Sequence, residues 1–146
     1  MAEQIHRLRI FVASPKDCSA ERDTIRRLVS WNPTIQTIAR ELDVVAEVYG
    51  WEDVCPNGGR PQEVINAAIQ KYDPDWFVFV FWHRLGSDAG EGITGTEEEW
   101  RLAQHQHQRK EVCVSIYFNQ AGPPLYEIDG YQLEAVKRFR ENIMRK

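Results

Sequence analysis

The sequence predicts an α/β fold, a three-layer sandwich in which helices cover both faces of a central parallel sheet of four to five strands. Segments of strand and helix character alternate four times along the 146 residues, the order that right-handed crossovers between parallel strands produce. The run WFVFVFW (76–82) is apolar at every position, as a strand needs when both of its faces are covered. This run therefore belongs in the middle of the sheet.

The first strand and helix are predicted from a change in apolar spacing. LRIFVA (8–13) is a short apolar run that ends at Ser14 and a proline, so we expect a strand followed by a loop. Apolar residues then recur at helical spacing, with Asp17 or Ser19 as the cap. Asn32, just before a proline, predicts a second cap within this helical region.

The next two elements are a more polar strand and a short helix. DVVAEVYG (43–50) predicts the second strand, in which Glu47 interrupts the apolar run, as an edge strand tolerates. Pro61 begins the helix, and Asp73, followed by a proline, ends it.

The second half of the chain repeats the pattern after the apolar strand. A glycine-rich loop (83–95) leads into a helix expected from Thr96 to about Arg109, and VCVSIYF (112–118) predicts the fourth strand. Asp129 is expected to cap the last helix.

We expect the strand order 2-1-3-4, which is flavodoxin-like, because strand three is the most apolar and strand two the most polar. In open α/β sheets, ligands bind beyond the carboxyl ends of the strands where the order reverses, here between strands one and three. The loop that starts at Ser14 and the loop 83–95 should therefore line the site.

Composition and charge restrict the classes of function. Apolar residues make up 42% and charged residues 27% of the chain, which fits one domain over 1–146, and a charged last helix is compatible with excision from a longer multidomain protein. The net charge of −4 argues against nucleic-acid binding. No apolar run approaches the ~20 residues of a membrane span. Without a signal-peptide pattern, and with three scattered cysteines, we expect a cytoplasmic protein with no nucleic-acid or membrane partner.

Three consecutive carboxylates stand at the start of the helix that follows the glycine-rich loop. Successive helical residues turn by about 100°, so only one of Glu97, Glu98 and Glu99 can face the sheet. Glu99 lies three and four residues before Leu102 and Ala103 and shares their apolar face. A carboxylate held among apolar groups beside a ligand crevice is typical of catalytic sites.

A capping role competes for the same carboxylate. Thr96 and Glu99 have the spacing of a capping box, in which both side chains accept hydrogen bonds from the free backbone N–H groups of the first helical turn. The residues alone leave both roles of Glu99 open.

Other residues of the two loops suit a nucleotide. Lys16 and Arg84 can hold phosphates, although loop cations are more often only solvated. Trp82, at the end of strand three, can stack on a base or belong to the core. His105 and His107 lie on different faces of one helix, unlike a metal pair, so we expect no metal site.

The chain resembles bacterial Toll/interleukin receptor (TIR)-like domains, a family of formerly unknown function found ahead of NTPase or repeat modules in defence and signalling proteins. The resemblance covers about residues 8–118 and rests on IFVASPKDCSAERD, on DWFVFVFWHRLGS and, most specifically, on TGTEEEW. The family's glutamate falls on Glu99, and its arginine and glycine fall on Arg84 and Gly86. Three positions differ from the family pattern, Pro15, Leu85 and Thr94.

The resemblance implies hydrolysis of the nicotinamide–ribose bond of NAD⁺ in bacterial immune signalling, including antiviral defence, with NAD⁺ as the substrate and no cofactor. Glu99 would be the catalytic carboxylate, and the substrate-binding residues would be Ser14, Lys16, Trp82, Arg84, Gly86 and Thr96. Many relatives act only after self-association through TIR-type contacts. Further partners implied are C-terminal NTPase or sensor domains of a longer chain.

Two other functions remain open. One is a non-catalytic TIR-type adaptor that signals by self-association, for which Trp31 and Trp51 are expected surface anchors. The other is a nucleoside or nucleotide N-glycosidase that resembles deoxyribosyltransferases, with a similar fold and a similarly placed acid.

Overall fold

The computed structural model describes residues 4–50, 61–86, 95–109 and 112–145. The helices and strands follow in this order: β1 (His6–Ala13), α1 (Ser19–Trp31), α2 (Pro33–Glu41), β2 (Val44–Gly50), α3 (Pro61–Tyr72), β3 (Trp76–Phe81), α4 (Gly95–Arg109), β4 (Cys113–Phe118) and α5 (Gly130–Met144). Two 3-10 turns, η1 (Lys16–Cys18) and η3 (Leu125–Glu127), precede α1 and α5. None of the described helices has the length and apolar character needed to cross a membrane.

The four described strands form one parallel sheet in the order β2-β1-β3-β4, as predicted. In the register, Phe11 of β1 lies beside Phe77 of β3, and Phe79 lies beside Ile116 of β4. The predicted edge position of β2 is confirmed, and its Glu47 pairs with Arg7 of β1 at 3.2 Å. The order therefore reverses between β1 and β3, where the site was expected.

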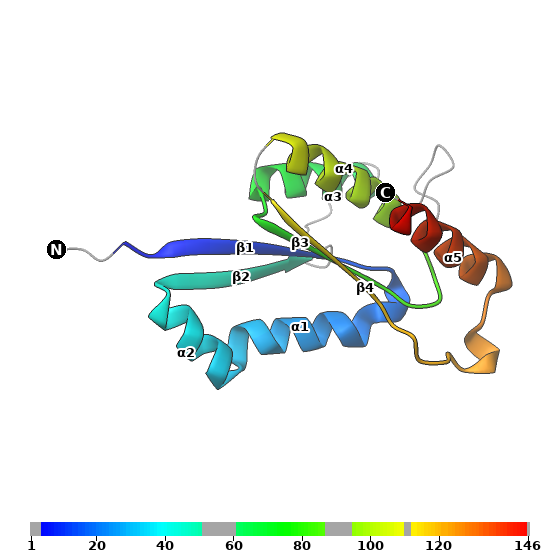
Figure 1. The fold of residues 1–146 in the computed structure, drawn as a ribbon, viewed down its shortest axis with the longest axis horizontal. Coiled ribbons are helices and arrows are strands. Elements are labelled where there is room, and N and C mark those ends of the chain that lie inside the picture. The colour runs from blue at the N-terminus through cyan, green and yellow to red at the C-terminus, as the bar shows by residue number, and fades with distance from the viewer. Residues whose placement is uncertain (1–3, 51–60, 87–94, 110–111, 146) are drawn as a thin grey trace.

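Helices cover both faces of the sheet, which confirms the three-layer sandwich. In Figure 1, α1 and α2 lie below the sheet and α3, α4 and α5 lie above it. The core above the sheet contains fully buried rings from alternate strand positions, Phe11, Phe77, Phe79 and Phe81. The intervening positions, Ile10, Val12, Val78 and Val80, pack toward α1. Both faces of β3 are thus buried, which explains why its sequence is apolar throughout.

The caps of the helices confirm two predictions and correct one. The Asn32 side chain accepts the backbone N–H groups of Thr34 and Ile35, so the predicted second cap begins a separate helix, α2. Asp129 likewise caps α5. Asp17 or Ser19 was expected to cap α1, but Asp17 lies in η1, Ser19 is the first residue of α1, and Cys18 before it forms no side-chain cap hydrogen bond. The Asp17 carboxylate bonds instead to the segment after β3.

Candidate functional site

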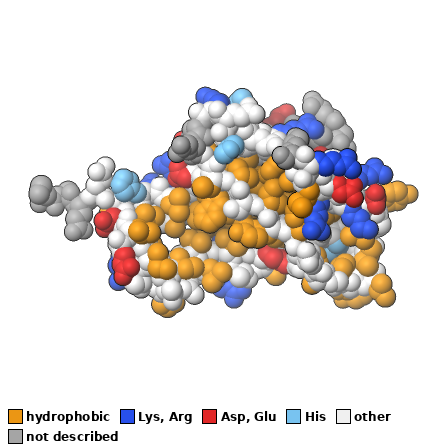
Figure 2. Space-filling view, in the orientation of Figure 1, with side chains coloured by type: hydrophobic (Ala, Val, Ile, Leu, Met, Phe, Trp, Pro, Cys, Tyr) orange, Lys and Arg blue, Asp and Glu red, His pale blue; other side chains and the backbone are white. Residues whose placement is uncertain are grey.

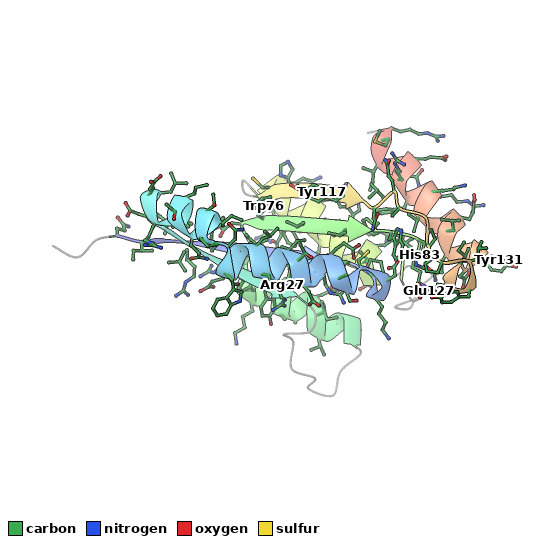
Figure 3. The ribbon with its side chains drawn as sticks, turned by 90° about the horizontal axis from the view of Figure 1, so that it is seen from below. Arg27, Trp76, His83, Tyr117, Glu127 and Tyr131 are labelled. Atoms are coloured by element: carbon green, nitrogen blue, oxygen red, sulfur yellow. The ribbon has the colours of Figure 1, made fainter. Side chains whose placement is uncertain are left out.

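The candidate site lies at the carboxyl ends of β1 and β3. Ala13, the last residue of β1, is paired with Phe79 of β3, so the loops that leave these strands start side by side. Figure 3 shows His83 just beyond the end of β3. The described start of the second loop, residues 83–86, therefore meets the loop after β1 as predicted, and the contacts between them define the geometry.

Asp17 joins the two loops. Its Oδ2 atom accepts hydrogen bonds from the backbone N–H groups of His83 at 3.0 Å and Arg84 at 3.1 Å. The same oxygen lies 3.6 Å from Nε2 of His83, which is beyond hydrogen-bond distance. His83 is only 2% exposed, and neither ring nitrogen has a hydrogen-bond partner within the part of the chain that the structure describes.

Gln132 of α5 holds the two residues that follow Arg84, Leu85 and Gly86. Its Oε1 atom accepts the backbone N–H groups of Leu85 at 2.9 Å and Gly86 at 3.2 Å, and its Nε2 donates to the Gly86 carbonyl at 3.0 Å. Gly86 has a φ of 120°, a conformation that a residue without a side chain adopts most easily. Four consecutive backbone N–H groups, 83 to 86, therefore donate to only two side-chain oxygens.

Arg22 fixes the loop after β1 from below. The buried guanidinium donates from Nη1 to Ser14 Oγ at 2.7 Å and to the Pro15 carbonyl at 2.9 Å. Ser14 is itself buried, and its Oγ atom already accepts this hydrogen bond from Arg22. For a substrate, Ser14 keeps its hydroxyl hydrogen and the second lone pair of Oγ.

The predicted phosphate ligands differ in exposure. Lys16 is exposed in η1, whereas Arg84 is half-buried. Trp82 donates from Nε1 to the Ala121 carbonyl at 2.7 Å. Its ring packs edge-on against the His83 ring, with ring centroids 4.5 Å apart. These contacts, together with its packing on the core next to α1, favour the core alternative for Trp82.

The start of α4 turns one glutamate inward, as predicted. The buried residues of α4 are Thr96, Glu99, Ala103 and Gln106, which share one face, and Glu99 is 5% exposed. Glu98 instead accepts a hydrogen bond from Asn66 of α3 at 3.0 Å. α4 begins at Gly95, so Thr96 lies in its first turn.

The Cys18 thiol is not a nucleophile in this site. Burial first, and then the charges of Asp17 and Glu21, raise the pKa of Cys18 far above its usual range. A thiol with such a pKa stays protonated near neutral pH, and the thiolate is the reactive form.

Two cavities lie away from these loops. A groove of about 450 Å³ between α1 and the β3–β4 half of the sheet is lined mostly by apolar side chains. Figure 2 shows hydrophobic side chains gathered over this middle region, and Figure 3 shows Trp76 and Tyr117 beside α1. A second cavity, of about 480 Å³, lies between α3 and α4. Glu99 is not among the described residues that line either of them.

Several predicted features lie outside the described residues. They are Trp51 and the part of the glycine-rich loop at 87–94, which includes Thr94. Four residues of the site were missed in the sequence: Asp17 as a tie between loops, Arg22, His83 and Gln132. A polar residue directly after an apolar strand could have drawn attention to His83. Nothing local marks Gln132, because its contacts lie 46 and 47 residues away along the chain.

Comparison with known proteins gives a family and no function. A family model described as a domain of unknown function (DUF4062) matches residues 9–146. Neither the curated proteins nor the solved structures contain a match to the chain.

Proposed function

The chain belongs to the DUF4062 family, and we propose that its domain hydrolyses the nicotinamide–ribose bond of NAD⁺, the activity that its resemblance to TIR-like domains implies. The observation that carries the proposal is the position of Glu99. This carboxylate is 5% exposed and belongs to the helix that follows the loop after β3. Acidic side chains are rarely buried to this extent, so a carboxylate turned inward at the start of α4 calls for a specific role.

The chemistry suits a single carboxylate. The nicotinamide of NAD⁺ is already cationic, so it leaves without a general acid, and the ribosyl carbon becomes oxocarbenium-like as the bond breaks. A fixed anion beside that carbon, or hydrogen-bonded to the ribose hydroxyls, stabilises the developing positive charge. We assign this role to Glu99, whose burial removes the water that would otherwise screen its charge.

Two cations are available for the diphosphate. Lys16 and Arg84 belong to the two loops that meet at the carboxyl ends of β1 and β3. Within the described residues neither side chain forms an ion pair or a hydrogen bond. Their charges are therefore free to contact substrate phosphates, in the position that α/β sheets use for ligands.

Self-association belongs to the proposal as its activating step. In a single copy Glu99 is almost inaccessible, so a substrate reaches it only after the neighbouring segments move. Contacts between clustered copies can stabilise such a moved state, since a partner that binds one conformation shifts the population toward it.

The experiment is NAD⁺ incubation of the domain with and without forced clustering, with free nicotinamide as the readout. We expect release that rises on clustering. The same assay with free nucleosides and nucleotides tests the N-glycosidase alternative, which predicts their turnover in place of NAD⁺.

An adaptor role is the second candidate. Trp31 is 79% exposed, and three further large side chains, Leu125, Tyr126 and Tyr131, are almost fully exposed around η3 and the start of α5. Several large apolar side chains exposed close together, as around η3, are typical of an interaction surface. Self-association without nicotinamide release at any concentration would favour the adaptor over the enzyme.

A further inference from the structure

The segment that follows β3 is held by side chains from two other parts of the chain. β3 ends at Phe81, and beyond it the backbone N–H groups of residues 83–86 donate to Asp17 and Gln132. Asp17 comes from the loop after β1 and Gln132 from the first turn of α5. The segment is therefore clamped from both ends, with Arg84 at the centre.

Both clamping side chains are themselves fixed. The loop that carries Asp17 is held by the buried Arg22 guanidinium. The helix that carries Gln132 is capped by Asp129 and packs Phe139 against the Phe81 ring, with ring centroids 5.0 Å apart. Because both anchors are fixed, the four hydrogen bonds restrict the backbone of residues 83–86.

The clamp fixes the backbone of Arg84 but leaves its charge free. The Asp17 carboxylate is directed at the N–H groups of His83 and Arg84, and no described carboxylate pairs with the Arg84 guanidinium. An arginine with a fixed backbone and an unpaired guanidinium is suited to bind an anion in a defined place, because its backbone has little conformational freedom left to lose on binding.

We propose that Asp17 and Gln132 are positioning residues of the nucleotide site, which hold the 83–86 segment so that Arg84 meets the diphosphate of the substrate. The inference rests on the proposed function and adds the part of the substrate that the clamp recognises. Asp17 and Gln132 do not touch the reacting atoms and act through the backbone of the segment.

The test compares KM and kcat of clustered enzyme for two substrates. NAD⁺ carries the diphosphate, and nicotinamide riboside has the same scissile bond without phosphates. Gln132→Leu removes the oxygen and the N–H donor at similar size, and Gln108→Leu on the exposed end of α4 is the matched control. Asp17→Asn keeps an oxygen for the two N–H groups but removes the charge, so it should lower kcat/KM for NAD⁺ less than Gln132→Leu does.

We expect Gln132→Leu to lower kcat/KM for NAD⁺ on the order of 10- to 100-fold, the cost of a displaced binding group, mainly through KM. The value for nicotinamide riboside should change by less than about threefold, as should both values in Gln108→Leu. In the double variant with Arg84→Gln, the loss should not exceed that of Arg84→Gln alone, because the two residues act through one contact.

Three outcomes would overturn the positioning role. They are a wild-type KM for NAD⁺ in Gln132→Leu, an equal loss with both substrates, and additive losses in the double variant. A wild type that releases no nicotinamide under clustering overturns the proposed function itself, and with it this role, before any variant is compared.

Discussion

The Oδ2 atom of Asp17 lies 3.0 Å from the backbone nitrogen of His83 and 3.6 Å from Nε2 of the same residue. One carboxylate oxygen thus holds the end of β3 against the loop after β1, and both side chains are nearly inaccessible to water. Hydrogen bonds to an ionised acceptor are among the stronger ones in proteins. The junction of the two central strands should therefore depend on this side chain.

Asp17→Ala should destabilise the fold. The change leaves the N–H groups of His83 and Arg84 without their acceptor, and the loss of hydrogen bonds to a charged group predicts a decrease of about 2–4 kcal/mol in the unfolding free energy. Urea denaturation of wild type and variant measures this decrease. Asp23→Ala, on the exposed side of α1, is the control and should change the value by less than about 0.5 kcal/mol. An equal decrease in the unfolding free energy for both variants would contradict a stabilising role of the Asp17 hydrogen bonds to His83 and Arg84.

Arg22 and Ser14 should be energetically coupled. Arg22→Met should lower the unfolding free energy by about 1–3 kcal/mol, because it removes the Arg22 donor from the buried Ser14 Oγ and leaves the Pro15 carbonyl with only the Cys18 N–H. Ser14→Ala removes one end of the same bond and should cost less once Arg22 is gone. A double-mutant cycle gives the coupling energy, and a value near zero would mean that the 2.7 Å contact does not contribute to stability.

The buried Cys18 thiol predicts a loss of stability in alkali. Burial and the nearby carboxylates raise the pKa of this thiol in the folded state. At pH values above about 8.5, the unfolded chain therefore loses the thiol proton while the folded protein still keeps it. The contribution is complete below about pH 8.5 and decreases by up to ~1.4 kcal/mol per pH unit above it.

The check is urea denaturation of wild type and Cys18→Ala between pH 7 and 10. Other groups titrate in this range, so the difference between the two proteins isolates the thiol. Cys18→Ala should be less stable at pH 7 because it leaves a cavity, and the gap should narrow toward pH 10. A constant gap would show that the thiol titrates alike in the folded and unfolded states.

The order of the strands could be predicted because its signals are local. β3 is apolar on both faces, and β2 carries Glu47 in an otherwise apolar run, so burial alone ranks them within the sheet. Glu99 could be placed inward for the same kind of reason, since a helix fixes which neighbours share its face. Both predictions use spacing within a single element.

The ties of the site could not be predicted, because they join elements far apart in sequence. Asp17 has the composition and position of a helix cap, and only the packing of β1 beside β3 brings its carboxylate to residues 66 and 67 positions away. Gln132 reaches Gly86 only because α5 crosses the same end of the sheet. Such contacts depend on how elements pack, which spacing within one element does not encode.

The central claim is that Glu99 stabilises the ribosyl cation during NAD⁺ cleavage. The most direct measurement is the rate of nicotinamide release by clustered wild type, Glu99→Gln and Glu97→Gln, each checked for an unchanged fold by circular dichroism. The account predicts a decrease on the order of 10²- to 10³-fold for Glu99→Gln and a rate close to wild type for Glu97→Gln. Equal rates in all three proteins would contradict it.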